Sequence, residues 1–224
     1  MPPLFVNVKI AMPGHEPIDA RLCVDTGGSE AISFNRPFVE KNRLLDQLKE
    51  RIPSTERGYA GESKSVAGRI ESLTLGGYVI HNPIAGFSLA QQGATAESGD
   101  DGTIGNALLR RFHIIFNYGR DIMIIEPNAA FDDPFEYDMS GLQLIADGDD
   151  LKTIHVSGII PDSPAALAGV RRNDIITDVD GMPSTAFDLA WLDSYLKQEG
   201  RNISVTVQRG ATPIYLRFTL KRLL

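Results

Sequence analysis

The tripeptide Asp25-Thr26-Gly27 directly follows a short apolar run that is typical of the end of a β-strand. Two carboxylates about 3 Å apart cannot both ionise, so they share one proton and together supply a base and an acid. Peptide-bond hydrolysis without a metal requires both, because water must lose a proton while the leaving nitrogen gains one. In such a pair Asp25 would supply one carboxylate, the Thr26 hydroxyl would fix its loop to the partner loop, and Gly27 would let the two backbones approach closely. The same tripeptide also occurs in plain turns, so its surroundings must decide.

Two further glycine-rich segments follow in the chain. Gly58-Tyr59-Ala60-Gly61 is a hairpin candidate, and Ile104-Gly105-Asn106 precedes a short apolar helix pattern. An Asp-Thr-Gly on a strand, a central Gly-rich hairpin and an Ile-Gly-Asn before a helix, in this order, resemble the retropepsin-like aspartic peptidases over about residues 4–130.

This resemblance implies a closed β-barrel lobe and assigns roles to four more residues. Tyr59 and Gly61 would belong to a flap over the substrate, and Gly105 and Asn106 to the loop beneath the active site. Tyr59 also fits a plain surface hairpin with a half-buried ring. Asn106 stands where the family frequently has Asp or Arg, and Gly28 where it often has Ala.

The chain contains no second Asp-Ser-Gly or Asp-Thr-Gly. The resemblance therefore implies a partner loop, either from a two-fold homodimer or from another lobe. Some bacterial relatives resemble two such lobes in tandem followed by a C-terminal module, and this chain resembles their second lobe with that module. We accordingly expect either a homodimer or a missing N-terminal lobe.

The C-terminal part resembles a bacterial-type PDZ domain over about residues 137–222. The resemblance rests on three motifs, which are Ser140-Gly141-Leu142-Gln143-Leu144, a Ser-Pro-Ala-Ala at 163–166 and an Asn-Asp-Ile-Ile at 173–176. The resemblance implies a β-sandwich or barrel with two helices, whose Gly141–Leu144 loop holds the carboxylate of a C-terminal peptide added as an extra strand. Apolar residues that could line the peptide pocket, or instead belong to the core, are Leu142, Leu144, Leu189 and Leu192.

Proline and aspartate without periodicity at 127–134 indicate a boundary, so we predict a peptidase lobe at 1–134 and a PDZ domain at 135–224. The predicted class is mainly β. A helix is expected across 35–52, with Asn35 as its N-cap. Others are expected at 164–168 and at 187–198, where Thr185 and Asp188 would form a capping box.

Composition and missing motifs argue against several other classes of function. With 29 acidic and 22 basic residues, the net charge of -7 disfavours nucleic-acid binding. No run is long enough for a membrane span, and one cysteine with four scattered histidines predicts no metal site. Nucleotide motifs are absent, so no cofactor is expected. The Gly-x-Ser-x-Gly elbow is also absent, which excludes a PDZ-bearing serine protease. Arg110-Arg111 is interpreted as a solvated pair.

We therefore predict an aspartic endopeptidase that acts on proteins or peptides, in which the PDZ domain selects or presents substrates. The alternative is a catalytically incomplete lobe that serves with its PDZ domain as a peptide-binding or dimerisation module. No secretory signal precedes the first strand, and an extracytoplasmic location is expected only if the native protein is longer.

Overall fold

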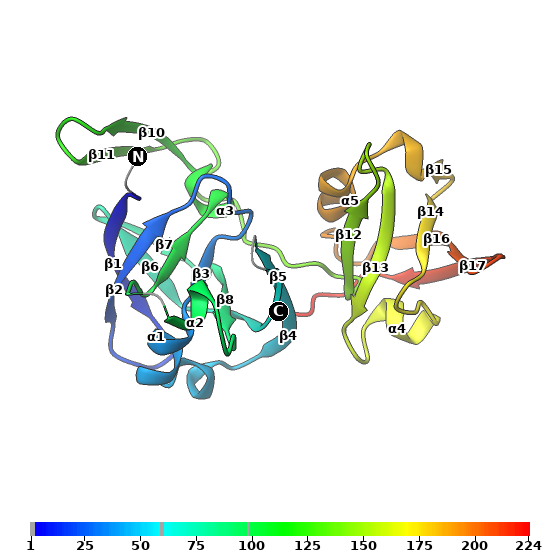
Figure 1. The fold of residues 1–224 in the computed structure, drawn as a ribbon, viewed down its shortest axis with the longest axis horizontal. Coiled ribbons are helices and arrows are strands. Elements are labelled where there is room, and N and C mark those ends of the chain that lie inside the picture. The colour runs from blue at the N-terminus through cyan, green and yellow to red at the C-terminus, as the bar shows by residue number, and fades with distance from the viewer. Residues whose placement is uncertain (1–2, 59–60, 98) are drawn as a thin grey trace. The chain divides into compact units, whose positions relative to one another are not determined.

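The structure, a computed structural model, consists of two compact units (Figure 1). The first runs to Phe135 and includes Leu224, and the second spans Glu136–Leu223. Strands dominate both, which confirms the predicted mainly β class. The residues that the structure describes are 3–58, 61–97 and 99–224.

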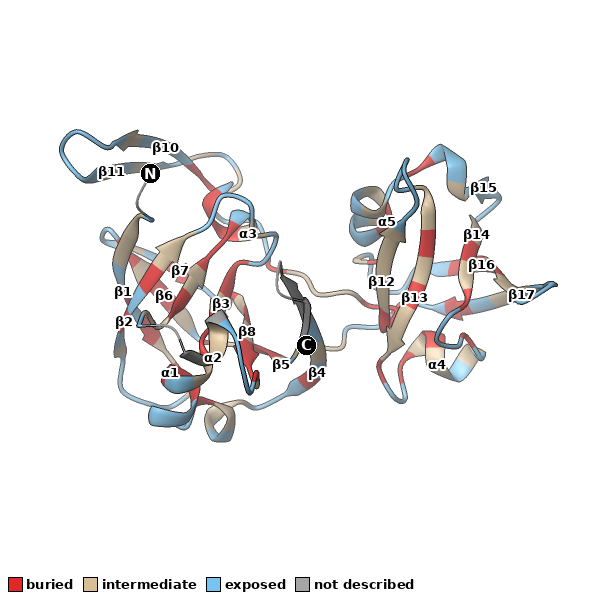
Figure 2. Ribbon diagram, in the orientation of Figure 1, coloured by how far each residue is buried: buried red, intermediate tan, exposed pale blue. Residues whose placement is uncertain are grey.

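One sheet carries the core of the first unit. Its strands β1 (Phe5–Ala11) and β2 (Ile18–Val24) form an antiparallel hairpin in which Val8, Ile10 and Leu22 are buried. Figure 2 colours the strands of this sheet by burial. Burial of alternate residues is what the sequence pattern predicts for strands with one buried face. In the described residues the strand order is β4 (Arg51–Gly58), β5 (Gly61–Arg69), β8 (Ile84–Ser88), β3 (Ile32–Phe34), β9 (Gly102–Ile104), β2 (Ile18–Val24), β1 (Phe5–Ala11), β6 (Ser72–Leu75) and β7 (Tyr78–His81).

The parallel pairing of β2 with β9 positions the candidate catalytic loop. Val24 at the end of β2 lies opposite Ile104 at the end of β9. Gly102 opens β9 with a φ of +152°, and a Cβ there would collide with the Ser33 carbonyl, so only glycine lets β9 lie this close to β3. The residues that follow the two strands, Asp25 and Gly105, therefore enter neighbouring loops.

The prediction of one helix across 35–52 is correct for its first turns and wrong for the remainder. Helix α1 covers only Arg36–Lys41, a 3-10 turn follows at Leu44–Gln47, and Ile52 lies in β4. Arg43 adopts a left-handed φ of 51°, which ends the helix. Asn35 precedes α1 as predicted, but its side chain donates to Asp100 instead of capping the helix.

A two-stranded ribbon, β10 (Phe112–Asn117) and β11 (Ile122–Pro127), lies outside the main sheet (Figure 1). One face packs on the core through Ile114, Met123 and Ile125. On the other face Ile115 and its cross-strand partner Ile124 are 62% and 48% exposed. The short helices α2 (Ala94–Glu97) and α3 (Asn106–Leu109) complete the unit.

Arg111 is buried, which corrects its interpretation as a solvated residue. Its guanidinium donates to the carbonyls of Ala130 (3.2 Å), Phe131 (3.1 Å), Asp133 and Pro134 (3.3 Å) and lies over the ring of Phe135. Burial lowers the pKa of the guanidinium, and the neighbouring Arg110 lowers it further. The charge is thus compensated by carbonyl dipoles that tie residues 130–135 to the first unit.

The second unit is a β-structure with two short helices. The strand order in its sheet is β12 (Leu142–Asp147), β13 (Thr153–Ile159), β14 (Ile175–Val179), β16 (Asn202–Arg209) and β17 (Thr212–Thr219), with β15 (Met182–Pro183) paired to β14. Strand β12 therefore has an open edge in this sheet.

The two helices of this unit begin at clear caps. Helix α4 covers Pro164–Ala168 as predicted, with the Ser163 hydroxyl accepting the Ala166 N–H. Helix α5 covers Leu189–Tyr195 and is shorter than predicted at both ends. It begins after Asp188 because the Asp188 carboxylate accepts the Trp191 N–H at 2.8 Å. The predicted capping box is wrong, because Thr185 lies in a separate 3-10 turn, Ser184–Ala186, and does not cap α5.

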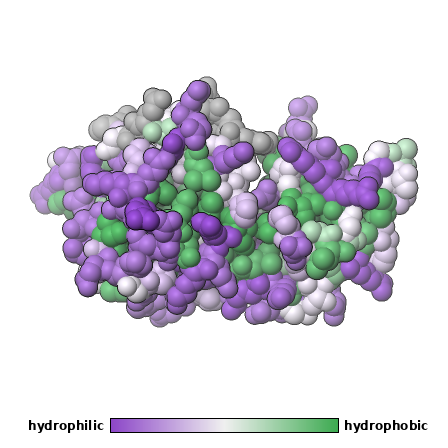
Figure 3. All heavy atoms as spheres, turned by 90° about the horizontal axis from the view of Figure 1, so that it is seen from below, coloured by the Kyte–Doolittle hydropathy of each residue, from purple (hydrophilic) through white to green (hydrophobic). Residues whose placement is uncertain are grey.

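A groove on the second unit runs between α4 and β17. Its apolar lining includes Pro164, Leu167, Phe218 and Leu220, and Leu167 is 77% exposed. Apolar side chains are visible between hydrophilic ones on the face of the second unit that Figure 3 shows.

Candidate functional site

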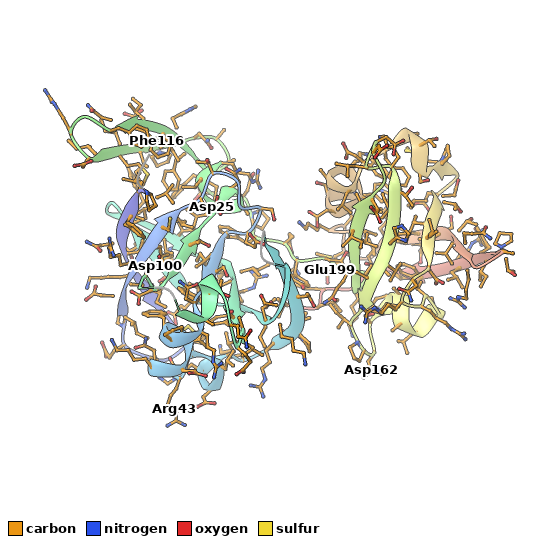
Figure 4. The ribbon with its side chains drawn as sticks, viewed as in Figure 1. Asp25, Arg43, Asp100, Phe116, Asp162 and Glu199 are labelled. Carbon is orange, nitrogen blue, oxygen red and sulfur yellow. The ribbon has the colours of Figure 1, made fainter. Side chains whose placement is uncertain are left out.

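Asp25 is exposed at the first position after β2 (Figure 4). Its backbone N–H donates to the Ile104 carbonyl at 2.9 Å, which anchors it to β9. Its Oδ1 atom accepts the N–H groups of Gly27 at 2.9 Å and Gly28 at 3.1 Å. The local sequence thus fixes the orientation of a carboxylate that solvent and a partner can reach, as general acid–base chemistry requires.

The Gly105–Asn106 loop holds the Asp25 loop in place through two hydrogen bonds. The Asn106 side-chain amide donates to the Thr26 carbonyl at 2.6 Å, and its backbone N–H donates to the Gly28 carbonyl at 2.8 Å. A Cβ on Gly105 would collide with the Glu30 carbonyl, so the loops can approach this closely only with glycine. Asn106, which departs from the family pattern, therefore has a structural use here.

The structure thus brings together five of the residues that the sequence singles out, Asp25, Thr26, Gly27, Gly105 and Asn106. Of the two residues predicted for the flap, Gly61 begins β5 and pairs with Gly58 at the end of β4. Tyr59 lies outside the described residues.

Cys23 lies immediately before this site and is partly buried. Burial raises the pKa of its thiol, and the charges of Asp100 and Asp25 raise it further. The thiol is therefore protonated at neutral pH and is a poor nucleophile.

In the second unit, Gly141 begins the predicted peptide loop with a φ of +83°. A Cβ at this position would collide with Ser163, so the loop requires glycine. Gln143 lies over Gly158, where a Cβ would collide with the Gln143 side chain, and its carbonyl accepts the Ser157 hydroxyl at 2.9 Å.

The apolar residues predicted for the peptide pocket divide into two groups. Leu142 and Leu192 are 6% and 1% exposed and belong to the core of the second unit. Leu144 on β12 and Leu189 on α5 are only partly buried and pack against that core. The latter pair is thus better placed than the former to contact a bound peptide.

Asp138 was not singled out by the sequence, yet it organises this loop. Its Oδ1 accepts the N–H groups of Ser140 at 3.0 Å and Gly141 at 2.5 Å, and its carboxylate accepts the Ser140 hydroxyl at 2.8 Å. Burial raises the pKa of Asp138 to about 6, a rise that these hydrogen bonds oppose and the Asp193 charge supports. A sequence signal exists, since an Asp two residues before Ser-Gly is typical of a turn closed by its own side chain.

In residues 3–58, 61–97 and 99–224, every helix is too short or too polar to span a bilayer. The same residues contain no group of three or more His, Cys, Asp or Glu side chains that could hold a metal ion.

The comparison with family models identifies part of the second unit. The family model of the PDZ domain matches residues 155–209, so the chain contains a PDZ domain. No curated protein matches the chain.

Several solved structures are similar at low identity. A retropepsin-like aspartic protease from Rickettsia conorii is 21% identical, covering 55% of this chain and 89% of its own, with a TM-score of 0.39. The HtrA3 PDZ domain bound to a phage-derived ligand is 23% identical over 35% of this chain and 80% of its own, with a TM-score of 0.31. The serine endoprotease from Yersinia pestis is 17% identical over 97% of this chain and 80% of its own, with a TM-score of 0.35.

Proposed function

We propose that the chain is an aspartic endopeptidase subunit whose first unit supplies one half of a catalytic carboxylate pair. The observation that carries the proposal is the exposed Asp25, oriented by two N–H groups and braced through Asn106. Such preorganisation is what an acid–base group needs, and a plain turn does not require a second loop to support it.

The chemistry needs a second Asp-Thr-Gly loop facing the first. The ionised member of the pair takes a proton from water, which attacks the peptide carbonyl, while the protonated member donates to the carbonyl oxygen. The proton taken from water then passes to the leaving nitrogen as the tetrahedral intermediate breaks. The exposed apolar face around Ile115 and Ile124 is a surface that a second copy or another lobe could cover.

The PDZ domain would hold an extended peptide against the open edge of β12, next to α5. Leu144 and Leu189 would contact its side chains. Peptide binding here would select or retain protein substrates of the catalytic unit.

The decisive experiment compares the wild-type chain with Asp25→Asn in cleavage of casein, with and without pepstatin. The variant should lose cleavage and keep its fold, because the amide preserves the shape but removes the charge and the shared proton. Asp132→Asn, which changes another exposed carboxylate of the first unit, is the matched control and should cleave normally. Cleavage that survives in Asp25→Asn would refute the assignment.

The chain's single Asp-Thr-Gly favours one alternative, a peptide-binding module without catalysis. Wild-type protein that binds peptides and does not cleave casein even when it self-associates would establish this alternative.

A further inference from the structure

Strand β17 is the open edge at the end of the second unit's sheet opposite to β12. Leu220, which follows β17, donates its N–H to the Arg201 carbonyl and accepts the Gly200 N–H, both at 2.9 Å. These two bonds lie on the side of β16. Backbone groups alternate between the two sides of an antiparallel strand, so Arg217 and Thr219 direct theirs to the open edge. An extended chain can therefore pair with this edge through main-chain bonds.

The groove between α4 and β17 borders this strand. Helix α4 lies beside β17 (Figure 1). The groove has a volume of about 700 Å³, within the range of roughly 300–1,000 Å³ that is usual for binding pockets. Its apolar lining includes Leu167, which is 77% exposed, and the buried residues Phe218 and Leu220. An apolar groove rimmed by charged side chains is typical of a surface that a partner covers.

The β17 side of the groove carries positive charge without an acidic partner. Arg217 and Lys221 line this side and are exposed. Arg217 donates to a tyrosine hydroxyl of its own strand at 2.6 Å, and in the described part of the chain neither cation forms an ion pair. The lining also holds two acids, which Figure 4 labels. Glu199 lies 3.6 Å from Arg222, and Asp162 lies on the opposite wall, in the turn before α4.

These features determine which side chains an added strand needs. Successive side chains of a strand point to opposite faces. On one face they would meet the apolar groove at Leu167 and Phe218, and on the other they would lie opposite Arg217 and Lys221, where acidic side chains are favoured. A second copy would bring its own two cations to this edge, and like charges across a strand pair destabilise it. The charges therefore favour an acidic partner over self-association.

We propose that the edge of β17 and the adjoining α4 groove form a second docking site, which takes an extended segment of a partner protein in which apolar and acidic residues alternate. Pro213, near the start of β17, has no N–H, so pairing is confined to the later part of the strand. The site is separate from the peptide groove of the proposed function, because β12 and β17 lie at opposite ends of the sheet. The PDZ domain would thus hold one extended chain at each edge.

The first arm of the test compares two fluorescein-labelled peptides, blocked at both ends, in binding to the full chain. One is acetyl-Gly-Glu-Val-Glu-Val-Glu-Val-Gly-amide, and its twin has Lys in place of each Glu. The Glu peptide should bind at least about tenfold more tightly in fluorescence anisotropy. The chain's net charge of -7 attracts the Lys peptide, so non-specific attraction does not produce this result. Equal affinities, tighter binding of the Lys peptide, or no binding of either would overturn the proposal.

The second arm uses variants of exposed residues, which preserve the fold. Leu167→Asp should weaken binding of the Glu peptide at least about tenfold, the effect of losing a leucine side chain that a partner buries. Leu151→Asp, which changes a 60% exposed leucine of the β12–β13 loop, should bind as wild type. Arg217→Glu should remove the preference for the Glu peptide, and Arg172→Glu, in the loop after α4, should keep it. Wild-type binding by Leu167→Asp, or an unchanged preference in Arg217→Glu, would refute the site.

Amide hydrogen exchange then locates the bound peptide. With saturating Glu peptide, the N–H groups of Arg217 and Thr219 should exchange at least about tenfold more slowly. Protection confined to β12 would place the peptide in the other groove and overturn the proposal. Sedimentation equilibrium distinguishes the remaining occupant. If the wild-type chain self-associates and Leu167→Asp does not, a second copy covers this edge and the proposed class of partner is wrong.

Discussion

Substituting Asp138 by Asn should change how the stability of the PDZ domain depends on pH. Burial raises the pKa of Asp138 from 3.8 to about 6 in the folded chain. Between these values the folded state keeps a proton that the unfolded state releases, so stability falls as pH rises through this window. Each pKa unit corresponds to about 1.4 kcal/mol, and the ionised carboxylate therefore destabilises the folded state by roughly 3 kcal/mol above pH 7.

Asp138→Asn removes this ionisation. The free energy of unfolding of the variant, relative to wild type, should rise between pH 4 and pH 7 by up to about 3 kcal/mol and then level off. Any constant difference between an amide and a protonated acid cancels, because only the change with pH is compared.

Trp191 makes the measurement specific. It is the sole tryptophan of the chain and stacks between Phe187 and Tyr195 in the second unit, so its fluorescence follows the unfolding of the PDZ domain. Urea titrations at several pH values give the free energies, with Asp149→Asn as the control. A difference that is flat with pH, or that falls as pH rises, would refute the argument that Asp138 is ionised at a desolvation cost.

The other predictions concern the first unit. Asn106→Ala should lower kcat of cleavage roughly tenfold with little change in KM, because the Asp25 loop loses its bond at Thr26 while the binding surface remains; an unchanged kcat would contradict this. Arg111→Met leaves buried carbonyls without donors and should lower stability by about 3 kcal/mol, measured by circular dichroism in a transition that Trp191 does not report. Ile115→Glu should weaken self-association at least about tenfold in sedimentation equilibrium, and equal dimerisation of variant and wild type would exclude the ribbon as the interface.

Local patterns predict much of this fold because they act over a few residues. The alternation in β1 and β2 gives two strands with one buried face, and Ser163-Pro164 with Gly169 marks the ends of α4. The predicted helix across 35–52 fails for a tertiary reason, since Ile52 is used by the β4–β5 hairpin and not by a helix face.

Burial is harder to predict than secondary structure. Arg111 follows another arginine at a helix end, which is typical of a solvated pair, and nothing nearby in the sequence indicates that carbonyls of residues 130–134 will surround it. Likewise, Leu142 and Leu192 fit a groove as well as a core by type, and their packing among the other buried residues of the second unit assigns them to the core. Long-range contacts determine whether such residues are buried, and local sequence patterns do not reveal these contacts.

Asp25 and Asp138 show the same limit in its sharpest form, because their local structures are alike. Each carboxylate accepts the N–H groups two and three residues further on, Gly27 and Gly28 in one loop and Ser140 and Gly141 in the other. Asp25 is exposed after β2, so water, substrate and a partner loop can reach it. The Asp138 carboxylate is desolvated, and its hydrogen bonds stabilise its own turn. The hydrogen-bond pattern orients a carboxylate in both cases, and its surroundings determine whether that carboxylate can react or can only hold a loop in place.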